Sequence, residues 1–151
     1  MKLISKPLDL TREFKRLTKK YCSFKWAVAW ASSGSEIFEE LAENKFKIEK
    51  ITVGIHFYQT HPDFIKEFIN YPNVHFIQQP EGTFHPKVYL FSNSESDWEL
   101  IIGSANFTAS AFSKNTEASL LVSHQDINAI EVYNTALEII DSSFNKGKVF
   151  T

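Results

Sequence analysis

The order of short apolar runs along the chain constrains its fold more than any other feature. Residues 24–32 (FKWAVAWAS), 48–58 (IEKITVGIHFY) and 74–80 (VHFIQQP) each read as a strand. A nearly continuous apolar run such as 24–32 is typical of a strand that is buried on both faces. Stretches with helical spacing of apolar residues separate these runs. This alternation predicts a parallel or mixed sheet in the first half of the chain.

Apolar residues spaced three and four apart predict two helices near the N-terminus. One face of the first helix carries Leu10, Phe14, Leu17 and Tyr21. Asp9 is placed to cap its first turn. The second helix lies within residues 32–44, with Ser33 or Ser35 as its cap and Ile37, Phe38 and Leu41 facing inward.

Two further helices are expected downstream. The third opens at His61-Pro62-Asp63, because proline is tolerated in the first turn of a helix. Ser123 and Asp126 have the spacing of a capping box, which predicts the start of a long fourth helix. The apolar residues expected on this helix are Ile127, Ile130, Leu137, Ile140 and Phe144.

Consecutive strands follow one another in the second half of the chain. Residues 85–91 and 98–104 are separated by the polar cluster SNSESD, which predicts an antiparallel hairpin, and residues 117–123 give one more strand. The expected class is therefore α/β, a mixed sheet with helices on both faces. The 151 residues suit one domain, 1–151, and the polar tail NKGKVFT leaves open that it is a piece of a longer chain.

Composition excludes several kinds of site. A single cysteine, Cys22, makes neither an intrachain disulfide nor a cysteine-rich zinc site, and it favours a reducing, cytoplasmic setting. No run approaches the ~18 apolar residues of a membrane span. The net charge is −2, so a site for a polyanion must be local. His56 and His61 are interpreted as solvated or structural, and no metal site is expected.

One group of residues carries a chemical pattern. His85 and Lys87 are two apart in an expected strand and so share a face. They are followed by Gly103-Ser104-Ala105-Asn106, by Thr108 at the start of a helical turn, and by Glu117. Displacement at a phosphodiester needs a nucleophile, donors to the non-bridging oxygens and an acid for the leaving oxygen. A neutral imidazole can attack, while a lysine and an amide bind the phosphate.

The ordered pattern resembles the phospholipase D superfamily, in particular its single-motif, nuclease-like branch. The resemblance covers roughly residues 82–123 and implies an α-β-α sandwich. It implies a metal-independent and cofactor-independent phosphodiesterase with a phosphohistidine intermediate. Our leading hypothesis is a DNA endonuclease or the nuclease domain of a larger defence or restriction protein. His85 is then the nucleophile, while Lys87, Ser104 and Asn106 bind the phosphate. Glu117 orients an imidazole, as an equivalent acidic residue does in the family.

The resemblance also implies a homodimer. Family active sites use two histidines, whereas none of the other four histidines is followed two positions later by lysine. Two copies of His85 would therefore meet across a two-fold axis. For Trp26 and Trp30, which share a face if both are in a strand, core or dimer packing is preferred over base stacking.

The sequence departs from the family motif at one position. An aspartate is expected five residues after Lys87, and Ser92 stands there. This departure keeps a second hypothesis open, namely a non-catalytic phosphate-binding, nucleic-acid-binding or dimerisation module. A third, phospholipid transphosphatidylation, is disfavoured because no apolar membrane-docking segment is evident.

Overall fold

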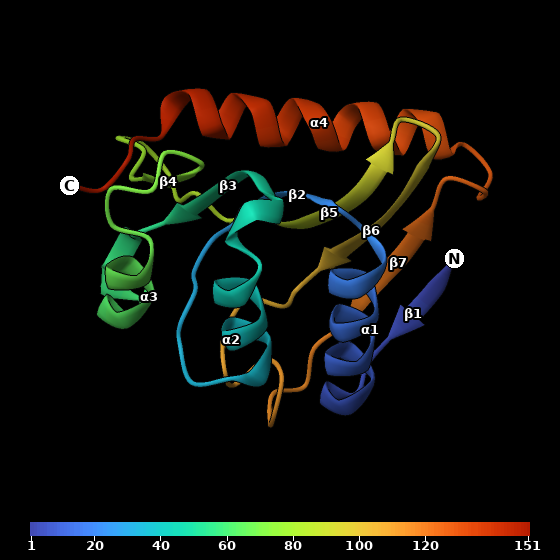
Figure 1. The fold of residues 1–151 in the computed structure, drawn as a ribbon, viewed down its shortest axis with the longest axis horizontal. Coiled ribbons are helices and arrows are strands. Elements are labelled where there is room, and N and C mark those ends of the chain that lie inside the picture. The colour runs from blue at the N-terminus through green and yellow to red at the C-terminus, as the bar shows by residue number, and fades with distance from the viewer.

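All seven strands join one mixed sheet. A computed structural model describes residues 1–151, and the strands lie in the order β1-β7-β6-β5-β2-β3-β4 (Figure 1). Their bounds are β1 Lys2–Ile4, β2 Ser23–Val28, β3 Ile48–Gly54, β4 Val74–Ile77, β5 Lys87–Ser94, β6 Asp97–Gly103 and β7 Ser119–Ser123. β2, β3 and β4 pair in parallel, and β5 and β6 form the predicted antiparallel hairpin. The prediction of a mixed sheet is confirmed.

Four α-helices cover the two faces of this sheet. They are α1 Pro7–Lys20, α2 Glu36–Glu43, α3 Pro62–Glu67 and α4 Ala129–Lys146. In Figure 1, α4 runs across one side of the sheet, while α1, α2 and α3 lie on the other. The α-β-α arrangement expected from the sequence is therefore present. None of the four helices combines the length and the apolar character that crossing a bilayer requires.

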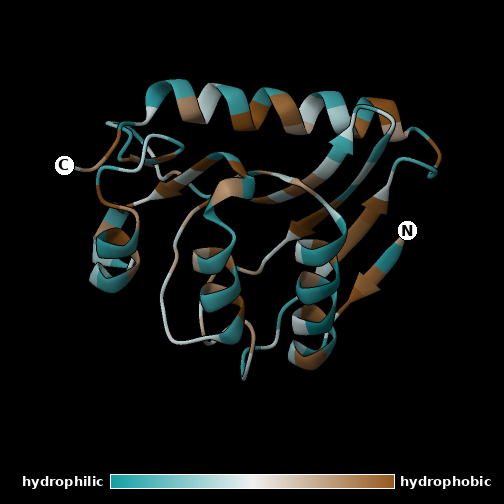
Figure 2. Cartoon of the chain, viewed as in Figure 1, coloured by the Kyte–Doolittle hydropathy of each residue, from teal (hydrophilic) through white to brown (hydrophobic).

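Two apolar cores fill the space between the sheet and its helices, one on each face. Phe14 of α1 is 1% exposed and packs edge to face against Trp26 of β2 and Tyr89 and Phe91 of β5. On the other face, Tyr133 of α4 packs against Trp98 of β6, with ring centroids 5.2 Å apart. Figure 2 shows hydrophobic colouring concentrated in the strands and alternating with hydrophilic colouring along the helices. Each helix therefore buries one stripe and leaves the other to solvent.

The helix starts confirm one capping prediction, for α2, and correct another, for α1. The side chain of Ser35 accepts from the backbone N–H of Phe38, as one of the two alternatives for α2 proposed. α1 instead begins at Pro7 after Lys6, so Asp9 lies inside the first turn and pairs with Arg12. Proline fixes the backbone angle of a first helical residue without losing an intrahelical bond, which explains the earlier start.

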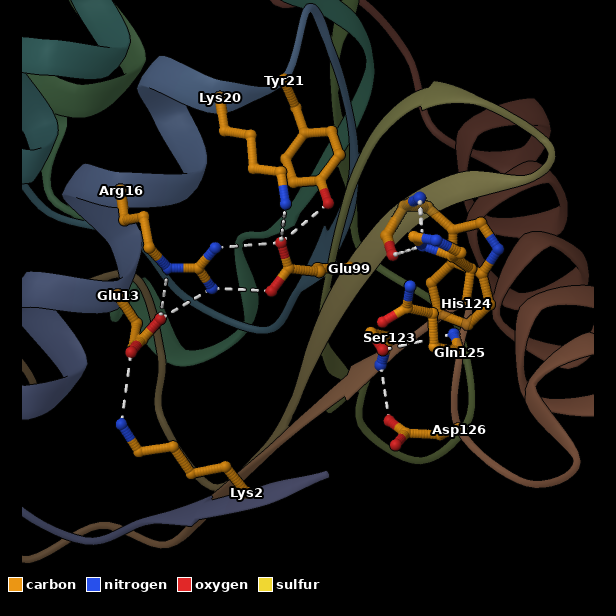
Figure 3. Close-up of polar contacts among 11 residues, drawn as sticks. Lys2, Glu13, Arg16, Lys20, Tyr21, Glu99, Ser123, His124, Gln125 and Asp126 are labelled. Atoms are coloured by element: carbon orange, nitrogen blue, oxygen red, sulfur yellow. Dashed lines mark hydrogen bonds and ion pairs between the residues drawn. The ribbon is translucent and has the colours of Figure 1, made fainter.

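The start of α4 is also different from the prediction. Asp126 does accept from the backbone N–H of Ser123, at 2.7 Å, but this bond closes a turn ahead of the helix (Figure 3). The N-cap is Asn128, with no side-chain capping bond. Ile127 and Ile130 are 86% and 63% exposed, so neither belongs to the buried stripe.

Four predicted strands are longer in the prediction than in the structure, and one strand was missed. The runs 24–32, 48–58, 74–80 and 117–123 contract to β2, β3, β4 and β7. β1 was not predicted, because its three residues are too short a run to carry a pattern. The trimmed residues lie almost entirely at one edge of the sheet.

A buried ion cluster joins α1 to β6. Glu99 is 8% exposed and accepts from both guanidinium nitrogens of Arg16, from Lys20 and from the hydroxyl of Tyr21 (Figure 3). Burial alone would raise the pKa of Glu99, but these donors lower it to about 2. Arg16 and Lys20 therefore pair with the buried carboxylate of Glu99, and Lys15 of α1 pairs with Glu36.

Candidate active site

Strand direction brings the predicted site residues to one edge of the sheet. Val28 at the C-terminal end of β2 is opposite Lys87 at the start of β5, and Gly103 at the end of β6 is opposite Ser119 at the start of β7. The loops that follow β2, β3 and β6 and those that precede β5 and β7 therefore share this edge. Residues that are distant in the sequence can contact one another there.

His85 and Lys87 meet, but not as two residues of one strand. β5 begins at Lys87, and His85 lies in the preceding segment, because Pro86 has no N–H for the sheet ladder. The Lys87 amine lies 2.8 Å from Nδ1 and 2.9 Å from Nε2 of the His85 ring, and 3.2 Å from the His85 carbonyl oxygen. His85 is exposed, whereas Lys87 is buried. The exposed His85 ring thus lies against the amine of a buried lysine.

Both groups have perturbed acidities. Partial desolvation, together with the charge of Lys87, lowers the pKa of His85 below its ordinary value. Burial also lowers the pKa of Lys87, against the attraction of Glu117. A protonated imidazole has no acceptor nitrogen, so the contact with the ammonium requires the neutral ring. The pair therefore favours an uncharged His85, which is the form that can attack an electrophile.

The Gly-Ser-Ala-Asn turn follows β6 directly. A Cβ on Gly103 would lie 2.2 Å from the carbonyl oxygen of Ala118, so only glycine permits this approach of β7. The buried Tyr89 hydroxyl donates to the Ala105 carbonyl at 2.8 Å and fixes the turn. Asn106 accepts from the backbone N–H of Trp30 at 3.3 Å, and its amide nitrogen makes no hydrogen bond within the chain. That amide is free to donate to a ligand.

Glu117 contacts Ser104 rather than His85. The Ser104 hydroxyl donates to one carboxylate oxygen at 2.6 Å, and the side-chain amide of Asn115 donates to the other at 3.0 Å. Glu117 lies two residues before β7, not on the strand as predicted. The residues after Thr108 form the predicted helical turn, in which the backbone N–H of Phe112 donates to the Thr108 carbonyl at 3.3 Å. Within one chain, then, the Ser104 hydroxyl is engaged by the carboxylate, and Glu117 acts on Lys87 through its charge.

Trp30 is the site residue that sequence reasoning missed. Its ring lies edge to face with His85, with centroids 5.2 Å apart, and 5.7 Å from the Lys87 amine. β2 ends at Val28, so Trp30 does not share the core position of Trp26. The sequence signal that could have found Trp30 is its spacing. Trp26, Val28 and Trp30 are two residues apart and so share one face of an extended segment, which leads from the core to the edge of the sheet.

A family comparison decides what kind of chain this is. Residues 27–138, well over half of the chain, match the model of a family described as "Cardiolipin synthase, PLD-like domain". The chain belongs to the phospholipase D superfamily. This superfamily membership confirms the predicted class of enzyme, a phosphodiesterase. A search of curated proteins by sequence finds no match.

Solved structures agree with this phospholipase D-like fold. The chain is similar to a phospholipase D family member, Nuc, from Salmonella typhimurium, with a TM-score of 0.68, 19% identity, and coverage of 92% of this chain and 88% of that one. NucT from Helicobacter pylori gives a TM-score of 0.68 at 17% identity over 99% and 98% of the two chains. Polyphosphate kinase from Porphyromonas gingivalis gives 0.64 at 13% identity over 94% and 26%.

Ser92, the departure from the phospholipase D motif, lies far from the site. Five residues of extended strand separate it from Lys87, a distance of about 16 Å. It is 5% exposed, opposite Ser23 and Trp98 at the far end of β5. By strand alternation its side chain points to the face opposite that of Lys87. The substitution therefore leaves the groups around His85 untouched.

The charge of Lys87 predicts a measurable change at His85. In Lys87→Met we expect the pKa of His85 to rise toward its ordinary value, because the neighbouring positive charge is lost. An NMR titration of the imidazole C–H signals measures this, with His85→Ala used to assign the resonance. Lys25→Met, at the other end of β2, is the matched control and should leave the titration unchanged. An unshifted His85 in Lys87→Met would contradict the assignment of the charge effect.

Proposed function

We propose that this protein is a metal-independent phosphodiesterase that cleaves DNA through a phosphohistidine intermediate. The observation that carries the proposal is the exposed His85 ring against the buried Lys87 amine. Asn106 is held by the backbone of Trp30, whose ring contacts His85. Residues 1–151 act as one catalytic domain in this proposal. The resemblance of the motif to the nuclease-like branch supports DNA as the substrate.

The chemical steps follow from these groups. A ring nitrogen of neutral His85 attacks phosphorus, so that an N–P bond forms while the bond to the leaving oxygen breaks. Lys87 and Asn106 donate to the non-bridging oxygens, where negative charge gathers in the transition state. Water then attacks phosphorus, the N–P bond breaks, and His85 is regenerated. Partial desolvation and the positive charge of Lys87 lower the pKa of His85 and so favour the unprotonated ring before the attack.

The leaving oxygen needs a proton that this chain does not supply. A neutral His85 cannot be both nucleophile and acid in the same step. No other histidine contacts the Lys87 amine: His56 accepts from the backbone of Gln79 and His61 caps α3. We assign the acid to the partner subunit's His85, which is protonated in a two-fold dimer when the first His85 is neutral and gives its proton to the leaving oxygen. In the second step the same ring, now neutral, takes a proton from the attacking water as the N–P bond breaks. In the dimer, Glu117 would orient the ring.

Metal independence gives the direct test. We expect wild-type protein to cleave plasmid DNA at an unchanged rate in excess chelator, because Lys87 and Asn106 supply the positive charge and the donors themselves. The measurement is the rate of nicking on gels with and without chelator. Cleavage that requires added magnesium would refute the mechanism. Tight binding of DNA without cleavage would identify a binding module instead.

A further inference from the structure

The loop after β3 carries two exposed aromatic side chains beside the candidate active site. We propose that Phe57 and Tyr58 form a stacking platform for unpaired nucleobases and so direct the site to single-stranded nucleic acid. This inference rests on the proposed function, whose substrate class it narrows. It is carried by the exposure of the two rings, by the backbone that holds them, and by the position of Trp30 between the loop and His85.

The backbone is strained where it presents the two rings to solvent. Tyr58 is 100% exposed and Phe57 is 66% exposed. Their φ angles are 55° and 58°, in the left-handed region that residues with a Cβ rarely adopt. Two adjacent aromatic residues in this region are unusual, and such strain persists where the surrounding structure enforces it. The backbone thus turns outward two rings that an extended strand would have continued into the sheet.

The base of the loop is held by two buried side chains, His56 and Thr60. The buried His56 ring accepts from the backbone N–H of Gln79 through Nε2 at 3.1 Å. The Thr60 hydroxyl donates to the Gly54 carbonyl at 2.6 Å and accepts from the backbone N–H of Ala31 at 3.2 Å. Only the tip, with its two rings, projects from this frame. A platform that is fixed before binding loses little freedom when a base stacks on it.

Trp30 connects the loop to the site. Its indole N–H donates to the carbonyl oxygen of His56 at 3.1 Å, one residue before Phe57. The same indole lies edge to face with His85. The loop therefore begins one aromatic ring away from the proposed nucleophile. A strand whose phosphate lies at His85 would bring a neighbouring base to this side of the sheet edge.

A groove beside the two rings has room for a base. It has a volume of about 480 Å³, within the usual size range of small-molecule pockets. Ile55 and Ile65 form its apolar wall, and the exposed Gln78 gives it a polar edge. An aromatic face with an apolar wall and one amide suits stacking on bases of any kind.

The chemistry of the loop favours nucleobases over other occupants. Residues 51–65 contain no lysine or arginine, so the loop has no basic residues of its own for docking to an anionic membrane. The positive charge that a nucleic-acid backbone needs is that of Lys87 at the site itself. The surface area of two rings is also far smaller than the ~800 Å² that each partner buries in a stable protein interface. Bases in a duplex are stacked on one another, so a free stacking surface selects unpaired strands.

Binding without turnover tests the platform. In a His85→Ala background, which prevents cleavage, we expect Tyr58→Ala or Phe57→Ala to weaken binding of a labelled oligothymidylate by about 5- to 150-fold. An abasic strand of the same length should bind equally to all these proteins. Fluorescence anisotropy at fixed salt gives the affinities. Tyr58→Trp should bind as the tyrosine protein does, unlike Tyr58→Ala, because it keeps an aromatic ring at this position.

Phe46→Ala is the matched control. Phe46 is 79% exposed but lies just before β3, at the opposite end of that strand, so its loss should not change either affinity. An equal loss of binding to the abasic strand, or no loss at all, would overturn the platform. The platform would also be overturned if Tyr58→Ala lost binding only to anionic phospholipid vesicles, or if it changed the oligomeric state of the protein. If the wild-type protein failed to cleave DNA in chelator, the proposed function would be refuted. The affinities for oligothymidylate would not change, so the platform is tested separately.

Discussion

His85→Ala is expected to lower the rate of DNA cleavage by about 10⁴-fold or more, because it removes the attacking nitrogen itself. In the proposed dimer it removes the acid as well. The measurement is the cleavage rate in excess chelator, with unchanged thermal unfolding as evidence that the fold is intact. His124→Ala is a suitable comparison, because His124 contacts only the Trp98 backbone at the other end of β6. Cleavage that survives the loss of His85 would refute the mechanism.

Mixing the two proteins tests whether the site is shared between subunits. When wild type and His85→Ala exchange subunits freely, a site built from both His85 residues is intact only in the all-wild-type dimer. At equal amounts of the two proteins, activity should fall to about one quarter of the wild-type value, since random pairing squares the wild-type fraction. A site complete within one chain would keep about one half. The second result would exclude the shared site.

Glu99→Gln is expected to lower the free energy of unfolding by about 2–3 kcal/mol, because it leaves Arg16 and Lys20 without their carboxylate. Loss of one partner from a fully buried pair costs ~3–5 kcal/mol, but the side chains of Arg16 and Lys20 are 40% and 49% exposed, and water replaces part of the interaction. Urea titration measures the change. Glu36→Gln, which breaks an exposed pair with Lys15, is the control and should change stability little.

The same carboxylate predicts how stability depends on acid. The pKa of Glu99 is about 2 in the folded protein, below its unfolded value of 4.5. A lowered pKa means that the contribution of Glu99 is complete above pH 4.5 and is lost as the pH falls toward 2. Between these limits Glu99→Gln should show a shallower loss of stability than wild type. Parallel curves for the two proteins would show that other groups govern the acid transition.

Local patterns predicted most of the architecture. The apolar runs located β2 to β7. Apolar spacing located α1 and α2, and the proline and capping signals located α3 and α4. Strand ends were less predictable, since they depend on pairing with distant segments. Residues 29–32 leave β2 because their partner changes from β5 to the segment around Phe107, with which Ala31 forms a parallel bridge. No local pattern contains that exchange.

For the candidate site, the sequence by itself determined the residue types and their order: His85, Lys87, the Gly-Ser-Ala-Asn turn and Glu117. It did so because phosphoryl chemistry requires a nucleophile and donors, and the spacing places them at strand ends. Only the tertiary structure decided which groups touch. Glu117 contacts Ser104, Trp30 lies edge to face with His85, and Phe57 and Tyr58 turn outward. These positions depend on loops from different strands, whose relative placement is set by sheet register and packing.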